Sequence, residues 1–196
     1  MRHDVFPALL KGNTLLKIQL LYEQDIGSDI VNAIRIALRE AFNAQTIYEE
    51  TLVIPDTFYD NRRGQYLAEL VVEYASTFLK EDAYAILLSN KDAYVMGLNF
   101  VFGLAIPWLR TAAVFLARLA TGATRATLLN RVEKEVLHEL GHLLGLEHCK
   151  TPKCVMNFSN SLREVDIKTN RFCEKCYTKL QQKSNIRISE RYVLKE

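Results

Sequence analysis

The segment HELGHLLGLEHCKTPKC, residues 138–154, constrains this chain more than any other stretch. It contains three of the four histidines and two of the four cysteines of the protein, and the other two cysteines follow in CEKC at 173–176. Imidazole and thiolate groups are common ligands of zinc and other transition metals in proteins. The fold must therefore bring these side chains to one metal ion or to two.

The rest of the composition indicates an ordinary globular protein. Of the 196 residues, 49% are hydrophobic and 24% are charged, which allows one domain with a sizeable core. The longest apolar run, residues 95–109, is interrupted by Asn99 and Pro107 and is too short to span a bilayer. The N-terminal residues do not read as a secretory signal. We therefore expect a cytoplasmic protein whose thiols stay reduced, which favours metal ligands over disulfides.

Apolar residues in the first half of the chain alternate between strand and helix patterns. LLKIQLLY (15–22) predicts a buried strand, and QTIYEETLVI (45–54) predicts another that ends at Pro55. Between them, helical spacing predicts a helix that begins near Ser28, with an apolar face of Ile30, Ile34, Leu38, Ala41 and Phe42. After a polar loop, a second helix is predicted, with one face formed by Tyr66, Leu70, Tyr74 and Phe78.

Three short apolar runs follow, and each is bounded by polar residues, glycine or proline. They are AYAILLS (83–89), NFVFGLA (99–105) and AAVFLARL (112–119), and they predict sheet strands. A third helix is predicted over residues 128–144. This alternation indicates an α/β or α+β fold, in which a sheet packs against helices and a cysteine-rich segment closes the chain.

The third predicted helix carries two histidines on one side. Residues four positions apart on a helix lie ~40° apart around its axis, so His138 and His142 point the same way. The apolar residues of this helix fall on a nearly opposite face: Leu129, Val132, Val136, Leu140 and Leu143. Glu139 is placed to reach a metal-bound water, as in the HExxH arrangement of zinc hydrolases. Short HExxH strings also occur by chance, and two histidines on a helix can simply be solvated.

The third ligand decides between these interpretations. A catalytic zinc takes three protein ligands and keeps one open position. On an unbroken helix His148 would lie ~15 Å beyond His138 along the axis. Gly145 resolves this, because glycine adopts the left-handed conformation that ends helices and lets the chain turn back. The alternative is a glutamate from a later helix, such as Glu164, as in gluzincins; the combination of Gly145 and His148 disfavours it.

The pattern HExxHxxGxxH followed by a methionine resembles the metzincin clan of metallopeptidases and, more narrowly, the archaemetzincin family. That family places a cysteine directly after the third histidine, then a second cysteine, a nearby methionine and a late CxxC. Here those residues are Cys149, Cys154, Met156, Cys173 and Cys176. The resemblance is specific from residue 138 to residue 176, and the runs NFVFGLA and AAVFLARL also look similar to the family.

The resemblance implies an α+β, zincin-like fold. In such a fold, a twisted mixed β-sheet packs against two long helices, which are a backing helix and the active-site helix. A zinc ion bound by four cysteines stabilises a small C-terminal subdomain. Residues 1–148 would form an N-terminal subdomain with the sheet and the active-site helix. Residues 149–196 would form a C-terminal subdomain with the Met-turn and the structural zinc.

The resemblance also implies the roles of the site residues. His138, His142 and His148 would bind a catalytic zinc, and Glu139 would be the general base that takes a proton from the zinc-bound water and passes it to the leaving amine. Met156 would form the Met-turn beneath the metal. In some metzincin branches a tyrosine two residues beyond the methionine approaches the metal, but this chain has Phe158 there, which cannot ligate.

The four cysteines form a C-x4-C and C-x2-C set, which suits a closed, structural zinc site. From Cys149 onward the chain has 11 Lys and Arg against 5 Asp and Glu, a net charge of +6. Four of these basic residues adjoin the cysteines and would offset the thiolate charge: Lys150, Lys153, Arg171 and Lys175. The alternatives are two disulfides, or a zinc ribbon that binds nucleic acid, for which the aromatic and basic patch is missing. We expect two zinc ions per chain, one catalytic and one structural.

These observations lead us to expect a zinc-dependent metallopeptidase that acts on peptide or protein substrates as a monomer, without nucleic acid or membrane. The alternative is a catalytically silent module that binds zinc or peptide on a metzincin scaffold, and the presence of Glu139 argues against it. Residues 99–105 would be either an edge strand above the cleft or an ordinary core strand. Nothing in the sequence distinguishes an endopeptidase from an aminopeptidase.

Overall fold

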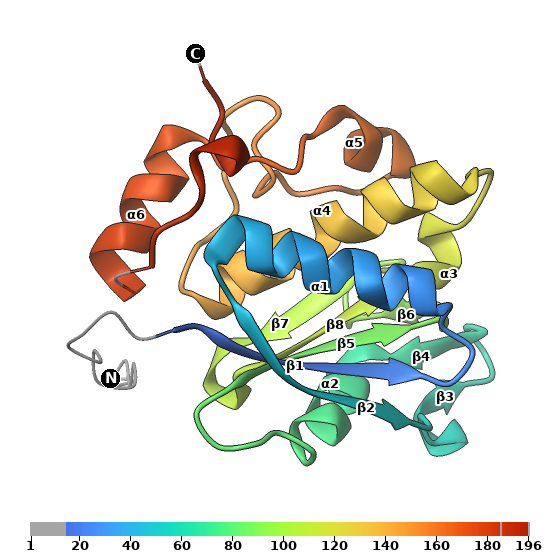
Figure 1. Ribbon diagram of the computed structural model, residues 1–196. Helices are drawn as coiled ribbons and strands as arrows, with labels where there is room; N and C mark the ends of the chain where they lie inside the picture. The colour runs from blue at the N-terminus through green and yellow to red at the C-terminus, as the bar shows by residue number, and fades with distance from the viewer. Residues whose placement is uncertain (1–14, 185, 196) are drawn as a thin grey trace, which may run out of the picture.

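A five-stranded β-sheet forms the centre of the computed structural model, which describes residues 15–184 and 186–195 (Figure 1). The strand order is β2–β1–β5–β8–β7. The strands are β1 (Lys17–Glu23), β2 (Gln45–Leu52), β5 (Tyr84–Ser89), β7 (Gly103–Ile106) and β8 (Thr111–Phe115). Neighbouring strands pair in parallel except β7, which pairs antiparallel to β8 at the edge of the sheet. The sheet is therefore mixed, as expected.

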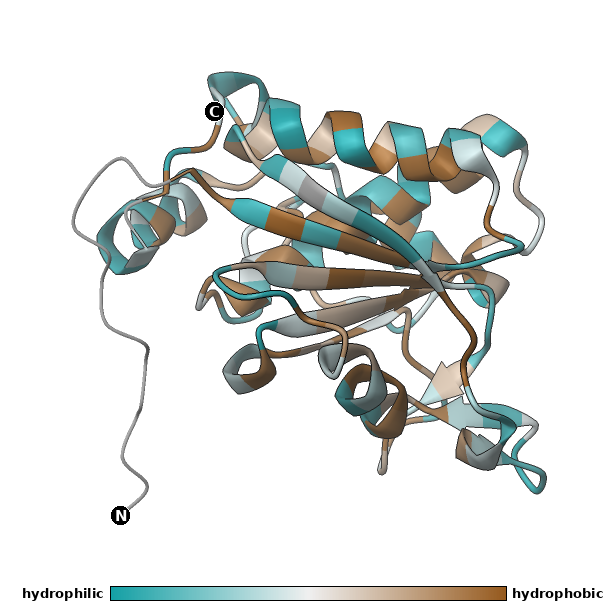
Figure 2. Ribbon diagram, turned by 60° about the horizontal axis from the view of Figure 1, so that its bottom comes forward, coloured by the Kyte–Doolittle hydropathy of each residue, from teal (hydrophilic) through white to brown (hydrophobic). Residues whose placement is uncertain are grey.

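Helices cover both faces of this sheet. The helices α1 (Ser28–Phe42) and α4 (Arg125–Leu143) lie over one face, and α2 (Ala68–Ser76) lies under the other (Figure 1). Because successive side chains of a strand point to opposite faces, Leu20 of β1 joins the core beneath α1 and α4 while Leu21 joins the core above α2. Hydrophobic residues are accordingly concentrated along the central strands (Figure 2).

A smaller sheet supports the loop that leads into β7. It consists of β3 (Tyr59–Asp60), β4 (Gln65–Leu67) and β6 (Ala93–Tyr94), in the order β3–β4–β6. Arg63 donates hydrogen bonds from Nη2 to the carbonyl oxygens of Leu98 and Asn99, at 3.0 and 3.1 Å. The guanidinium of Arg118 lies 4.3 Å from the centre of the Phe100 ring. These contacts hold residues 98–100 in place beside the sheet edge.

The chain after α4 packs back onto α4 and α1. It contains α5 (Leu162–Ile167), α6 (Glu174–Ser184) and the 3-10 turn η3 (Glu190–Tyr192). Phe172 is fully buried, and its ring meets that of Phe42 in α1 edge-on, with centroids 5.7 Å apart. One hydrophobic core therefore extends across residue 148, and the division into subdomains 1–148 and 149–196 stays a prediction. Within the described ranges, no helix combines the length and the hydropathy needed to cross a membrane.

Most elements predicted from periodicity are present, although two apolar runs differ from the prediction. In the run 99–105, strand pairing with β8 begins only at Gly103. In the run 112–119, β8 ends at Phe115 and the chain continues as the short helix α3 (Leu116–Leu119). Because both halves of that run are largely buried, its residues show no change of period that would mark the boundary. Two further 3-10 turns are η1 (Asp56–Phe58) and η2 (Pro107–Leu109).

The predicted face of the second helix is wrong. The buried residues of α2 are Ala68, Val71, Val72 and Ala75, whereas Leu70 is 36% exposed. Tyr66 lies before the helix, in β4. The large aromatic residues dominated the sequence pattern, but small and β-branched residues are the ones that fit closely against the sheet, and Tyr74 and Phe78 pack at the margin of this core.

Candidate metal centre

The helix α4 is buried on two sides. Thr124 caps its N-terminus by accepting a hydrogen bond from the Thr127 backbone N–H, at 3.2 Å. Four of the five apolar residues predicted to face the core are buried: Val132, Val136, Leu140 and Leu143. On the other side, His138 and Glu139 are only 5% and 4% exposed. The side of the helix that carries His138 and Glu139 is therefore buried as well.

The three predicted histidines meet at one point. The ligand atoms of His138, His142 and His148 all lie within 4.8 Å of one another. Nδ1 of His138 and Nδ1 of His142 each lie 2.8 Å from a backbone carbonyl oxygen, of Val155 and Leu146 respectively. Carbonyls only accept, so each Nδ1 donates and each Nε2 keeps a lone pair. These two Nε2 atoms are 3.1 Å apart.

Two lone pairs at that separation repel each other unless a cation lies between them, so the group fits a metal ion. Zinc–nitrogen bonds of about 2.0–2.1 Å in a tetrahedron would separate the nitrogens by about 3.3 Å. Burial lowers the pKa of His138 well below its ordinary value and that of His142 to about 4. It also lowers the pKa of His148. All three imidazoles are therefore neutral near pH 7, as metal ligands must be.

A Schellman turn delivers His148 to this point. Gly145 has a φ of 89°, in the left-handed region. The backbone N–H of Leu146 donates to the carbonyl of Gly141 at 2.9 Å, and that of Gly145 donates to the carbonyl of His142 at 3.0 Å. These are the two hydrogen bonds that define this motif. Gly145 thus ends α4 in the left-handed conformation, and the same turn places the Leu146 carbonyl 2.8 Å from Nδ1 of His142.

Met156 packs directly against the histidine-bearing helix. It is fully buried, and a Cβ added to Gly141 would lie 2.5 Å from its Sδ atom. The glycine in HELGH is therefore required by this close approach, which the sequence analysis did not foresee. The available signal was the glycine itself, which is unfavourable in a helix interior unless something packs closely against it.

Glu139 lies against the edge strand of the sheet. A Cβ added to Gly103 of β7 would collide with the Glu139 carboxylate, so only glycine fits there. Burial raises the pKa of Glu139 well above its ordinary value, and the charge of Glu135 raises it further. A carboxylate in this position is a stronger base than one in water. Gly103 is a second residue that the sequence analysis missed.

The four cysteines form a separate cluster. Their sulfur atoms lie within 4.8 Å of one another, with Cys149 to Cys173 at 3.7 Å and Cys154 to Cys176 at 3.8 Å. A disulfide would require about 2.05 Å. Zinc–sulfur bonds of about 2.3 Å in a tetrahedron separate the sulfurs by about 3.8 Å. The spacing therefore fits a tetrahedral metal site, and the cysteines are not paired as disulfides. The hydrogen-bond contact between the sulfur atoms of Cys154 and Cys176 lowers the pKa of Cys154 to about 5.

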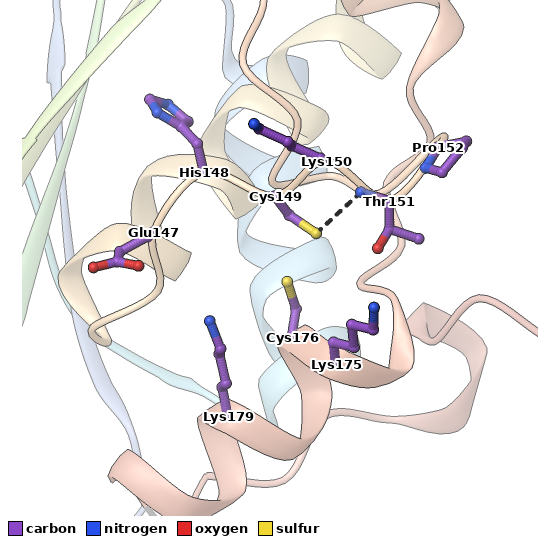
Figure 3. A pocket seen from close by; sticks show the side chains of 9 residues that line it. All are labelled: Glu147, His148, Cys149, Lys150, Thr151, Pro152, Lys175, Cys176 and Lys179. Atoms are coloured by element: carbon purple, nitrogen blue, oxygen red, sulfur yellow. Dashed lines mark hydrogen bonds between the residues drawn. The ribbon is translucent and has the colours of Figure 1, made fainter.

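Lysines surround the outer side of the cysteine cluster. A cavity of about 570 Å³ is lined by Cys149 and Cys176 together with Lys150, Lys175 and Lys179 (Figure 3). Lys150 and Lys175 were predicted to offset thiolate charge, and Lys179 joins them from α6. Lys153 and Arg171 do not line this cavity. Much of the basic excess of the C-terminal segment thus has a local electrostatic partner.

The histidines open onto a second cavity, a cleft of about 340 Å³. One wall is the edge strand β7 with the preceding loop, and another contains Phe158 and Ser159. Phe158 is 46% exposed, and its ring lies 4.9 Å from that of His148. Because β7 is at the edge of the sheet, the structure agrees with the interpretation of residues 99–105 as an edge strand rather than as a core strand.

Glu164 lies outside both metal-capable groups that the described residues contain. Its carboxylate accepts hydrogen bonds from the Asn160 backbone N–H and the Ser161 hydroxyl, at 2.7 and 3.1 Å, and so caps the start of α5. The gluzincin alternative has no support in this geometry.

Comparisons with known proteins agree with this site. Peptidase family M54 matches residues 16–182. An archaemetzincin from Pyrococcus abyssi is 47% identical over 131 residues, which cover 63% of this chain and 70% of the relative. One from Pyrobaculum aerophilum is 44% identical over 147 residues, 75% of this chain and 91% of the relative. The crystal structure of archaemetzincin from Methanopyrus kandleri matches with a TM-score of 0.80 and 35% identity, covering 89% of this chain and 98% of the other. The chain therefore belongs to Peptidase family M54, the archaemetzincins, and is a zinc metallopeptidase.

Proposed function

We propose that His138, His142 and His148 hold the catalytic zinc and that Glu139 is the general base in peptide-bond hydrolysis. The observation that carries this proposal is the convergence of three neutral imidazoles beside a buried carboxylate, on the floor of a cleft. The backbone carbonyls of Val155 and Leu146 fix two of the rings with Nε2 free. Such second partners usually set both the orientation and the basicity of ligating histidines.

Zinc bound at this site would polarise the peptide carbonyl and lower the pKa of a coordinated water. Glu139 would accept the proton of the attacking water and then donate it to the amine that leaves. Its burial supports this role, because a raised pKa makes the carboxylate a better proton acceptor. Gly103 contributes by leaving room for the carboxylate beside the edge strand.

The substrate would lie extended along β7. This strand pairs with β8 on one side only, so its outer edge offers backbone N–H and C=O groups for an added strand. The cleft wall beside it is mainly apolar, with Val95, Leu98, Phe100, Leu104 and Pro107 among its lining residues. The hydrogen bonds of Arg63 to the 98–99 carbonyls would keep this wall in place during binding.

The cysteine cluster would hold a second, structural zinc. Three of its four ligands are buried, which suits a closed site. Cys149 directly follows His148, and its backbone N–H donates to the carbonyl of Met156 at 2.9 Å. This ion would therefore fix the third histidine relative to the Met-turn. We further propose a monomer in the cytoplasm, where thiolates stay reduced, acting on peptides rather than nucleic acid.

The test is mass-spectrometric analysis of a diverse peptide pool incubated with zinc-loaded protein, beside a Glu139→Ala variant. Cleavages present only with the wild type would support the proposal, and the cut sites would show whether the enzyme removes terminal residues or cleaves internally. Absence of cleavage with two zinc ions bound would favour the catalytically silent module instead.

A further inference from the structure

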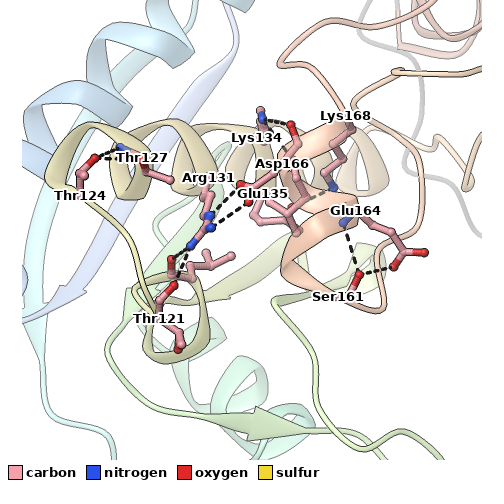
Figure 4. Close-up of polar contacts among 12 residues, drawn as sticks. Thr121, Thr124, Thr127, Arg131, Lys134, Glu135, Ser161, Glu164, Asp166 and Lys168 are labelled. Atoms are coloured by element: carbon pink, nitrogen blue, oxygen red, sulfur yellow. Dashed lines mark hydrogen bonds and ion pairs between the residues drawn. The ribbon is translucent and has the colours of Figure 1, made fainter.

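A buried ion pair joins α4 to the segment after α5, and neither of its members has a direct role in the mechanism above. Glu135, one turn before Glu139, is 3% exposed, and its Oε1 atom lies 2.8 Å from Nζ of Lys168 (Figure 4). Lys168 comes from the segment after α5 and is 2% exposed. Buried charges of this kind need a specific reason, because an apolar pair of similar size is often equally stable.

Glu135 faces the substrate cleft. It lines the same cavity as His138 and Glu139. Although Lys168 is close, the Oε1 atom of Glu135 makes no hydrogen bond of good geometry, and it is shielded from solvent. Ser159 lines the same cavity, and its hydroxyl oxygen is also buried without a hydrogen-bond partner among the described residues. Buried polar atoms without a hydrogen bond are rare in folded proteins. Here the Ser159 hydroxyl has none, and Oε1 of Glu135, whose one close partner is Lys168, lines the same cleft.

Lys168 ties Glu135 to the segment that carries Ser159. Its Nζ also donates to the carbonyl of Asn157 at 3.4 Å, two residues before Ser159. Neighbouring contacts clamp α5 to α4: Arg131 makes a two-pronged ion pair with Asp166, and Lys134 donates to the carbonyls of Val165 and Asp166 (Figure 4). A wall fixed in this way can present a preorganised binding site.

The local charge decides which chemistry such a site would recognise. Lys168 already neutralises Glu135, and Arg131 is neutralised by Asp166. A cationic substrate group would have to compete with Lys168 for the Glu135 carboxylate, so it is disfavoured. A neutral group that donates to the second lone pair of the Glu135 oxygen and also pairs with the Ser159 hydroxyl satisfies both groups.

We propose that Glu135 and Ser159 form a polar subsite that selects a substrate residue near the cleaved bond with a neutral hydrogen-bond-donating side chain: the hydroxyl of serine or threonine, or the carboxamide of asparagine or glutamine. This inference rests on the proposed peptidase function and adds a specificity to it. Both residues act by contact with the substrate side chain and take no part in proton transfer.

The experiment uses zinc-loaded full-length protein and a peptide library that contains matched isosteric pairs, threonine against valine and asparagine against leucine, at each position. Cleavage is measured as kcat/KM on the wild type, and binding is measured on the inactive Glu139→Gln variant. One or two neutral hydrogen bonds predict a preference of about 3- to 10-fold for the donor at one position. The other positions should prefer apolar residues or show no preference.

Two variants assign the preference to this subsite. Ser159→Ala should reduce it, and Glu135→Leu/Lys168→Met should abolish it while avoiding a buried unpaired charge. Ser76→Ala, on the opposite side of the sheet, is the matched control and should leave it unchanged. Thermal melting and zinc content establish that each variant is folded and loaded.

Each outcome separates this proposal from the peptidase function. If peptides are cleaved without a preference for donor side chains, or if both variants retain that preference, the subsite proposal is wrong and the proposed peptidase function stands. If peptides with donor side chains bind preferentially but none is cleaved, the proposed peptidase function is wrong and the subsite proposal stands. Neither cleavage nor preferential binding overturns both.

Discussion

The histidine group and the cysteine group adjoin each other in the sequence, yet their surroundings differ. The histidines are neutral, and they open onto a cleft beside Glu139. Three of the cysteines are buried, and lysines line the cavity next to them. An open site with neutral ligands would leave a metal ion electrophilic and accessible, whereas four thiolates would enclose it and more than balance its charge. The difference supports our proposal of one ion for chemistry and one for architecture.

Chelation should separate the two sites and have the largest effect on activity. We expect dilute chelator to remove the ion at the open histidine site first, which abolishes peptidase activity while one zinc per chain remains. The closed site should release its ion only with denaturant or a thiol-modifying reagent. Metal analysis beside activity measures this order. If both ions were lost at the same chelator concentration, the histidine site would not be more open than the cysteine site.

Glu139→Gln should reduce kcat by about 10²- to 10⁴-fold, the usual contribution of a general acid–base group. The zinc content should not change, because Glu139 is not among the converging histidine ligands. Glu164→Gln is the matched control and should keep its activity, since that carboxylate only caps α5. A large loss of zinc in Glu139→Gln would mean that Glu139 supports the metal rather than the reaction.

Cys154→Ser tests whether the two centres are mechanically coupled. We expect it to lose the structural ion and also to weaken zinc binding at the histidines by about 10- to 100-fold, as loss of supporting contacts commonly does. The reason is that Cys149 anchors the chain directly after His148. Titration with a zinc-buffering chelator measures the affinity. An unchanged affinity at the histidine site would show that the two centres are independent.

Gly141→Ala should destabilise the protein by about 1–3 kcal/mol, because the added Cβ overlaps Met156 in a packed core. Urea unfolding measures the change. Combining it with Met156→Val should recover part of the loss by restoring space. If Gly141→Ala alone is as stable as the wild type, the contact between Met156 and the histidine helix is looser than the structure indicates.

The sequence located the candidate ligands well because their arrangement is local. The histidines depend on the periodicity of one helix and on the turn at Gly145, both of which can be read within eleven residues, 138–148. The same locality explains why β1, α1 and β2 were predicted close to their observed bounds. The local pattern did not predict the buried face of α2, where Ala68 and Ala75 pack against the sheet in place of larger apolar residues.

The walls of the site depend on contacts that no local pattern reveals. Lys168 reaches Glu135 from 33 positions away, and Gly103 meets Glu139 from a separate strand. In the sequence, each of these residues looks like an ordinary charge or an ordinary glycine.

The sequence by itself thus determined the family and the candidate metal ligands, because ligand type, helix period and glycine turns act over short distances. The tertiary structure alone decided which strand borders the cleft, how tightly Gly103 and Gly141 let their neighbours approach, and which buried polar residues line the cleft. Those features arise from packing between segments that are distant in sequence, where the same residue types fit many arrangements until the fold selects one.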